Sequence, residues 1–154
     1  MKLIINTLLL FTLLTTLSCK SDDGISYDIK KVNNSVLSTN STTYLKTYFS
    51  TFPIKAVNEY EPIKPNGALY QVNLNDVFLV DFNKVGNWIS IEKLEKKDLP
   101  INIIHQSIQV YATKKYPEKS IEKIERNQQG YLVELKYDID LQFNKNGEFI
   151  EKLK

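Results

Sequence analysis

The chain has 154 residues, of which 42% are hydrophobic, and it carries 20 basic and 18 acidic side chains. This near-neutral balance argues against a nucleic-acid partner, because nucleic-acid binding needs a basic patch, and no basic stretch interleaved with aromatic residues is present. The length suits one domain, or two small units that share a core.

The first segment, residues 1–18, has the order of a signal peptide. Lys2 is followed by an apolar run over residues 3–17 and then by Ser18 and Cys19. A positive start, a hydrophobic stretch and a small residue before the cleavage site are the parts of such a peptide. The run is too short for a transmembrane helix, which needs roughly 20 apolar residues. We therefore expect residues 1–18 to be removed.

Cys19 is the only cysteine, and residues 16–19 resemble a bacterial lipobox in which Thr16 and Leu17 have exchanged places. We expect lipid on Cys19 to hold the protein to a membrane, because two or more acyl chains anchor a protein stably. An ordinary signal peptide cut nearby and an uncleaved anchor are the alternatives. A lipidated Cys19 leaves the folded part without a thiol for a disulfide, a metal or a nucleophile.

The next segment, residues 19–37, is polar and is predicted to be a flexible tether. The alternative is a partly ordered arm, with Val32, Val36 and Leu37 docked on the fold. Asp22 and Asp23 resemble the signal that moves some Gram-negative lipoproteins to the outer face of the outer membrane. We therefore expect the protein in the cell envelope, anchored to the outer membrane on its periplasmic or its outer side.

The remaining chain contains an internal repeat with a period of 61 residues. Seven identities fall within seventeen positions when Tyr70, Val72, Leu74, Phe82, Asn83, Lys84 and Gly86 are superposed on Tyr131, Val133, Leu135, Phe143, Asn144, Lys145 and Gly147. We therefore predict two repeats, residues 38–97 and residues 98–154.

Each repeat is predicted to begin with a helix. The first follows a Ser/Thr cluster near Ser41 that suits an N-cap, and its apolar face consists of Leu45, Tyr48, Phe49 and Phe52. The second is expected to start at Pro100 and to end at Tyr116 and Pro117. Its apolar residues recur at helical spacing: Ile101, Ile104, Ile108 and Tyr111.

Antiparallel strands are predicted to follow each helix. In the second repeat the residues expected to face the core are Tyr131, Val133, Leu135, Ile139, Leu141 and Phe143, and those expected to face solvent are Glu134, Lys136, Asp138, Asp140 and Gln142. Hairpin turns are predicted at residues 85–87 and 146–147, where Gly86 and Gly147 permit positive φ. The predicted fold class is α+β: a tandem repeat of two helix-plus-antiparallel-sheet units, with helices on one face and an open sheet face on the other.

Short motifs in this order resemble the PepSY-like, beta-lactamase-inhibitor-like family. They are YQVNL at 70–74, FNKVGNW at 82–88, LP at 99–100, KYP at 115–117 and FNKNG at 143–147. The resemblance spans about residues 38–154 and implies an exported protein with tandem helix-plus-sheet units, like the beta-lactamase inhibitory protein. It also implies protein binding or inhibition outside the cytoplasm. It supplies no catalytic residues and does not establish that a beta-lactamase is the target.

The residues able to carry chemistry do not form a recognisable catalytic or metal-binding pattern. His105 is the only histidine and lacks a second base or a nucleophile elbow, so we expect a structural or solvent-facing residue in the second helix. Asp138 and Asp140 are expected on one solvated strand face, whereas calcium needs about six to eight oxygen ligands. We therefore predict no enzymatic activity, no metal and no cofactor.

A protein-binding surface is instead predicted on the solvent face of the sheet, where Leu69, Val77 and Leu79 are apolar. Trp88 is either an anchor of this surface or a core residue between the two units. The predicted protein-binding face consists of Leu79, Trp88, Gln71, Asn73, Asp81, Glu134 and Asp140. The expected function is binding of an exported protein or peptide, as an inhibitor or modulator. A carrier of a small apolar ligand and a structural envelope lipoprotein without a discrete site are the alternatives.

Overall fold

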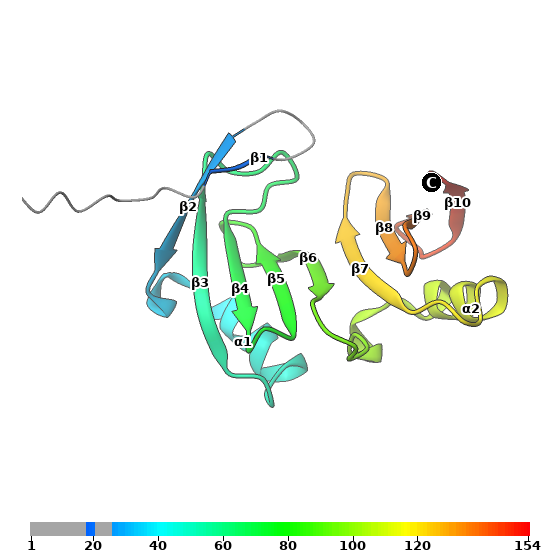
Figure 1. The fold of residues 1–154 in the computed structure, drawn as a ribbon, viewed down its shortest axis with the longest axis horizontal. Helices are drawn as coiled ribbons and strands as arrows, with labels where there is room; N and C mark the ends of the chain where they lie inside the picture. Colours follow the sequence, from blue (N-terminus) through cyan, green and yellow to red (C-terminus); the bar gives the residue numbers. More distant parts are fainter. Residues whose placement is uncertain (1–17, 21–25) are drawn as a thin grey trace, which may run out of the picture.

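The computed structural model describes residues 18–20 and 26–154. They form one antiparallel sheet of ten strands, in which the order in space is the order along the chain (Figure 1). The strands are β1 Ser18–Lys20, β2 Ser26–Val32, β3 Ile54–Glu61, β4 Tyr70–Leu74, β5 Phe78–Phe82, β6 Trp88–Lys93, β7 Ile121–Arg126, β8 Gly130–Leu135, β9 Ile139–Asn144 and β10 Phe149–Lys152.

The prediction of two separate helix-plus-sheet units is wrong, because the sheet is continuous through β6 and β7. Ile91 of β6 lies opposite Ile124 of β7, with Ser90 opposite Glu125 beside them. An unpaired strand edge exposes a row of backbone hydrogen-bonding groups. Pairing β6 with β7 satisfies two such edges at once, so a single long sheet replaces two short ones.

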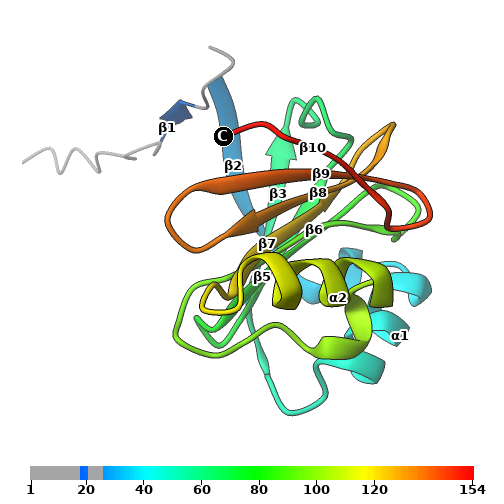
Figure 2. The same ribbon diagram turned by 90° about the vertical axis from the view of Figure 1, so that its right-hand side faces the viewer.

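Two helices lie on the same side of the sheet (Figure 2). Helix α1 spans Thr39–Tyr48 with Ser38 as its N-cap, and α2 spans Gln106–Lys115 with His105 as its N-cap. Each is preceded by a short 3-10 turn, η1 Asn34–Val36 or η2 Ile101–Ile103.

One of the two predicted limits of the second helix is confirmed. Its start at Pro100 is wrong, because η2 and an extended Ile104 separate Pro100 from α2. Its end is confirmed, since the helix stops at Lys115 and Tyr116 is its C-cap.

The core lies between the helices and the sheet. Seven strands contribute one fully buried residue each to a single row across the sheet: Val57, Val72, Val80, Ile91, Ile124, Val133 and Leu141. Leu45 and Phe49 near the end of α1, and Ile108 of α2, belong to the same core. Burying one such side chain contributes about 1.5–3 kcal/mol, so a slip of one residue in any strand would be costly.

The predicted alternation of β8 and β9 is confirmed at the buried positions Val133, Leu135, Leu141 and Phe143. Three residues predicted on the solvent face of these strands do not lie there. Gln142 is buried, with 2% of its surface exposed, and Lys136 and Asp138 lie in the turn between the two strands and not on a strand face. Tyr137 and Asp138 have φ values of 71° and 55°, the left-handed geometry that tight hairpin turns use, and residues 136–138 separate the paired Leu135 and Ile139. The positive φ values of Gly86 and Gly147 confirm the two turns predicted there.

Residues 26–37, predicted as part of a flexible tether, are ordered instead. β2 pairs with β3 from Asp28 opposite Glu61 to Val32 opposite Val57, and Leu37 is buried in the core. The partly ordered arm is therefore the better description of this part of the segment. The predicted signal peptide falls on residues 1–17, outside the described residues, and on Ser18 of β1.

Candidate functional site

Six of the seven residues predicted for the protein-binding face lie on the side of the sheet opposite the core. The strand register places Gln71 opposite Asp81, Asn73 opposite Leu79, and Glu134 opposite Asp140. Their side chains alternate with core residues along each strand, which sets their direction. The structure therefore places residues of both predicted repeats on one face of the sheet, from Gln71 in β4 to Asp140 in β9.

Four of these residues belong to a line that crosses six strands, which we call the cross-strand row. Each member lies opposite the next: Asn73, Leu79, Glu92, Lys123, Glu134 and Asp140. All six are partly exposed. Glu92 and Lys123 were not predicted as site residues, because the sequence does not reveal that β6 lies beside β7.

The cross-strand row is acidic, with three carboxylates and one ammonium group. Partial burial raises the pKa of the Glu134 carboxyl, and Asp140 raises it further, while Lys123 lowers it. Lys123 also lies 3.5 Å from a carboxylate oxygen of Glu125 on its own strand. Crowded carboxylates beside a partly exposed leucine favour a partner that is both apolar and basic.

Asp81 was predicted in the polar surroundings of the binding face, but it is almost fully buried, with 6% of its surface exposed. Lys64, from the loop between β3 and β4, lies 3.3 Å from Oδ2 and also 4.0 Å from the ring centre of Tyr60. Among the described residues Oδ1 has no hydrogen-bond partner. Burial raises the pKa of the Asp81 carboxyl, and Lys64 lowers it. Asp81 is covered by the loop that carries Lys64 and is not part of the open surface.

Trp88 is the one predicted site residue that lies on the helix side. It is 5% exposed, and its ring centre is 6.3 Å from that of Tyr44 in α1. The guanidinium of Arg126, from the neighbouring strand β7, lies 3.9 Å from the ring centre. Trp88 therefore has the second of its two expected roles, that of a core residue.

His105 caps α2 and does not lie within it. Its Nδ1 accepts a hydrogen bond from the backbone N–H of Ser107 at 3.3 Å. Within residues 18–20 and 26–154 there is no group of three or more His, Cys, Asp and Glu placed to hold a metal ion. In the same residues no helix has the length and apolar character needed to cross a membrane.

Cys19 lies in β1, at the N-terminal end of the sheet, opposite Tyr27. Lipidation of Cys19 stays a prediction.

Two hollows lie beside α2, where no site was predicted from the sequence. One, of about 420 Å³, is bordered by the segment from Asp98 to Ile104. Another, of about 620 Å³, is a groove between α2 and β10. Val110, on the outer side of α2, was a weak signal in the sequence, since it falls outside the expected apolar face.

A family model described as "Putative beta-lactamase-inhibitor-like, PepSY-like" matches residues 68–151. The match runs from before β4 to Glu151 of β10 and includes all six residues of the cross-strand row. Comparison with curated proteins gave no match.

Solved structures share the fold. A putative calcium-regulated periplasmic protein from Bacteroides thetaiotaomicron is 23% identical, with 82% of this chain and 97% of that chain covered and a TM-score of 0.68. A putative periplasmic protein of unknown function from Bacteroides vulgatus is also 23% identical, with 83% and 99% covered and a TM-score of 0.71. At this level of identity the likeness concerns the fold.

Proposed function

The chain belongs to the PepSY-like, beta-lactamase-inhibitor-like family, and from this premise we propose that it is an exported protein that binds another protein without catalysing a reaction. The binding surface is the open face of the sheet, centred on the cross-strand row. The protein that it binds is an exported enzyme, whose activity is modulated by the binding.

The observation that carries the proposal is the composition of the cross-strand row on a face that the helices leave uncovered. Leu79 is a partly exposed apolar residue, and Glu92 lies directly opposite it. Apolar groups surrounded by charges are typical of protein interfaces, where the charges select the partner and speed its approach. The matching partner has an apolar patch bordered by lysine or arginine side chains.

The alternative of a carrier for a small apolar ligand has less support. A carrier needs a concave apolar pocket with a few converging polar groups. The space between helices and sheet is filled by fully buried side chains such as Phe78, Phe82 and Phe143. The hollows beside α2 are bordered by charged residues, among them Asp98, Lys114 and Lys115.

The test is cross-linking in intact cells with the double variant Leu79→Glu, Asp140→Lys. We expect the wild type to recover a specific partner, and the double variant to lose it while unfolding at the wild-type temperature. The matched control is Thr47→Glu, which places a new charge on the exposed surface of α1 and leaves recovery unchanged. Recovery of the same partner by the double variant would show that the open face is not the interface.

The recovered partner also decides whether binding modulates an enzyme. Its activity is measured with and without the purified chain, and a change that Leu79→Glu abolishes supports modulation. Recovery of no partner by the wild type would instead support a structural envelope protein.

We include in the proposal a lipid anchor on Cys19 and a location in the cell envelope at the outer membrane. The support is the sequence of residues 1–19 and the description of the structural neighbours as periplasmic proteins. Radioactive fatty acid should label the wild type and not the Cys19→Ala variant. Equal labelling of both would contradict the anchor.

A further inference from the structure

Each helix forms a groove with a strand that follows a glycine turn: α1 with β6, after Gly86, and α2 with β10, after Gly147. The two grooves differ in what lies beside that strand. The α1/β6 groove, of about 410 Å³, is lined by Thr43, Tyr44, Thr47 and Trp88 and is bordered by Arg126 from β7. The α2/β10 groove is lined by Val110, Tyr111, Lys114, Lys115 and Phe149. β10 is the last strand of the sheet, and in the described chain it pairs only with β9.

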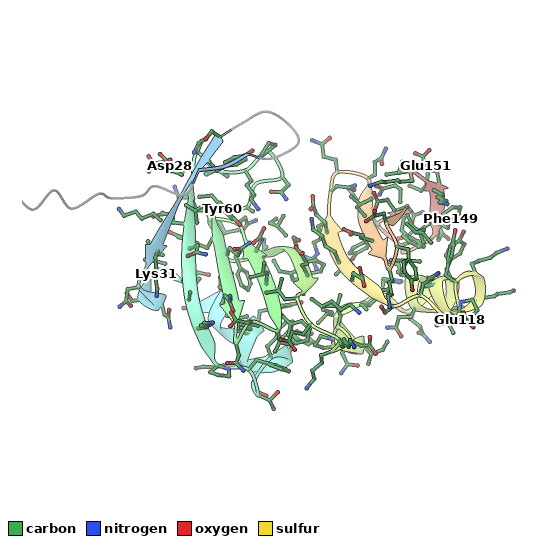
Figure 3. All side chains as sticks on the ribbon, viewed as in Figure 1. Asp28, Lys31, Tyr60, Glu118, Phe149 and Glu151 are labelled. Atoms are coloured by element: carbon green, nitrogen blue, oxygen red, sulfur yellow. The ribbon has the colours of Figure 1, made fainter. Side chains whose placement is uncertain are left out.

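Exposed apolar residues mark the α2/β10 groove as incomplete. Phe149 begins β10 as Trp88 begins β6, yet 37% of Phe149 is exposed against 5% of Trp88. The ring of Phe149 stacks on Tyr111 at 4.4 Å between centroids, and Val110 beside it is 60% exposed. Figure 3 shows Phe149 and Glu151 at the end of the sheet away from Asp28 and Lys31 of β2.

The free edge of β10 offers backbone groups to a further strand. The N–H of Leu153 donates to the carbonyl oxygen of Asp140 in β9 at 2.8 Å. Because backbone groups point alternately to the two sides of a strand, the N–H and C=O of Lys152 point away from β9. An extended peptide can pair with such an edge and gain affinity from main-chain hydrogen bonds.

Charge determines which side chains the α2/β10 groove accepts. At the end of α1 the groove residues are Thr47 and Tyr48, and the side chain that enters is the cation Arg126. At the end of α2 the corresponding helix positions carry Lys114 and Lys115. Two ammonium groups repel a cation and attract a carboxylate. Glu148 also lines the groove, and its carboxylate accepts a hydrogen bond from the side-chain amide of Asn144. The groove therefore suits an apolar side chain at Val110 and Phe149 and an acidic one near the two lysines.

A second copy of this chain meets like charges in two of the registers in which it could pair at the edge. Two β10 strands related by a two-fold axis pair antiparallel, and the residue at the axis then faces itself. Pairing centred on Glu151 opposes two carboxylates, and pairing centred on Lys152 opposes two ammonium groups. Like charges directly opposite each other destabilise a strand pair. Pairing centred on Ile150, where the register of β10 shifts, opposes two isoleucines, and sedimentation velocity tests this register.

We infer that β10 and the α2/β10 groove bind an extended segment of a partner protein as an added strand, with an apolar and an acidic side chain of that segment in the groove. This site lies on the helix side, at one end of the sheet, and is separate from the cross-strand row. It can therefore be tested independently of the open face.

The test measures the fluorescence anisotropy of a labelled nonapeptide, Thr-Leu-Thr-Glu-Thr-Leu-Thr-Glu-Thr, titrated with the full chain. Leucine and glutamate share one face of this peptide, so they enter the groove together in either direction. The matched control peptide has lysine in place of glutamate. We expect the acidic peptide to bind about tenfold more tightly than the basic one, and the difference to shrink in high salt.

Three variants of the chain locate the site. Lys152→Pro removes an outward N–H at a position where proline is tolerated, and it should weaken binding of the acidic peptide about tenfold. The double variant Lys114→Glu, Lys115→Glu should prefer the basic peptide. Leu79→Glu, on the opposite face, should bind as the wild type does. Circular dichroism checks that each variant is folded.

Two results would overturn the proposal. One is that the wild type does not bind the acidic peptide, or that neither Lys152→Pro nor the double variant Lys114→Glu, Lys115→Glu changes this binding. The other is a wild-type dimer in sedimentation velocity that Lys152→Pro converts to a monomer, which would make a second copy the occupant of the edge.

Discussion

Trp88 and Phe149 each begin a strand that follows a glycine turn, and each packs near a tyrosine of the helix above it. Their surroundings differ in one respect. β7 lies beside β6 and brings Arg126 over Trp88, whereas β10 ends the sheet and leaves Phe149 partly exposed. In this fold, the burial of an aromatic residue therefore depends on whether a further strand lies beside it as much as on the position of the residue in its own strand.

The largest expected effect comes from removing the two aromatic side chains in turn. Trp88→Ala leaves a cavity in the core and should lower the free energy of unfolding by about 3–5 kcal/mol. Phe149→Ala should lower it by about 1 kcal/mol, because the side chain already meets solvent. Urea denaturation measures both. Equal losses would show that the missing neighbouring strand does not matter for stability.

The glycine turns provide the next comparison. A Cβ on Gly86 would lie 1.9 Å from the Ser38 hydroxyl and 3.0 Å from the backbone nitrogen of Ser41, whereas a Cβ on Gly147 would lie 2.5 Å from the His105 ring. Both glycines have positive φ. Gly86→Ala should cost about 3 kcal/mol and Gly147→Ala about 1 kcal/mol, since an imidazole ring can turn aside. Thermal unfolding measured by circular dichroism ranks the two, and the reverse order would contradict this reason.

Removal of the charge over Trp88 tests what β7 adds. Arg126→Met keeps the length of the side chain but loses the cation–π contact, so stability should fall by about 1 kcal/mol. Trp88 is the only tryptophan, and its fluorescence emission should move to longer wavelength if the groove opens. Arg126→Lys is the matched control, because it keeps a positive charge. Unchanged emission in Arg126→Met would mean that neighbouring residues alone close the groove.

The smallest expected effect on stability concerns Asp81, which is buried beside Lys64 on the side of the sheet opposite the helices. Burial raises its pKa above the ordinary value of 3.8, so the folded protein holds this proton more tightly than the unfolded chain. Stability from Asp81 is therefore present below pH 3.8 and is lost as the pH rises through the pKa of the folded state. Unfolding free energies measured from acid to neutral pH should show this decline, and Asp81→Asn should flatten it.

The charge of Lys64 supplies the control for Asp81. Because Lys64 lowers the pKa of Asp81, Lys64→Met should move the decline in stability to higher pH. A decline that stays in place in Lys64→Met, or that persists in Asp81→Asn, would assign it to other groups.

The sequence predicted the face that most strand residues take and the hairpin neighbours within a repeat, but not that β6 pairs with β7. The alternation of Val133 with Glu134 reveals an inner and an outer side. Alternation of apolar and polar residues looks the same whether β6 is an unpaired edge strand or pairs with β7. The predicted division into two units was wrong for this reason. The missing pair also hid Glu92 and Lys123 from the predicted face.

Other differences have local causes. β2 is mostly polar because Tyr27 is its only buried residue, with 4% of its surface exposed. Asp81 is covered because the loop carrying Lys64 folds back over the sheet, which strand alternation does not predict. The α2/β10 groove escaped prediction because its residues come from two segments that meet only in the folded chain.

The strand order, identical with the chain order from β1 to β10, also bears on how the molecule forms. Every strand pairs with its neighbours in sequence, so most pairs close short loops at a small entropic cost. Folds with such local pairing form quickly. A chain that emerges one end first could add each strand to a sheet already begun, without waiting for a distant partner. β10 joins the sheet after the other strands of the described chain, and its outer edge is where an added strand would continue the same process.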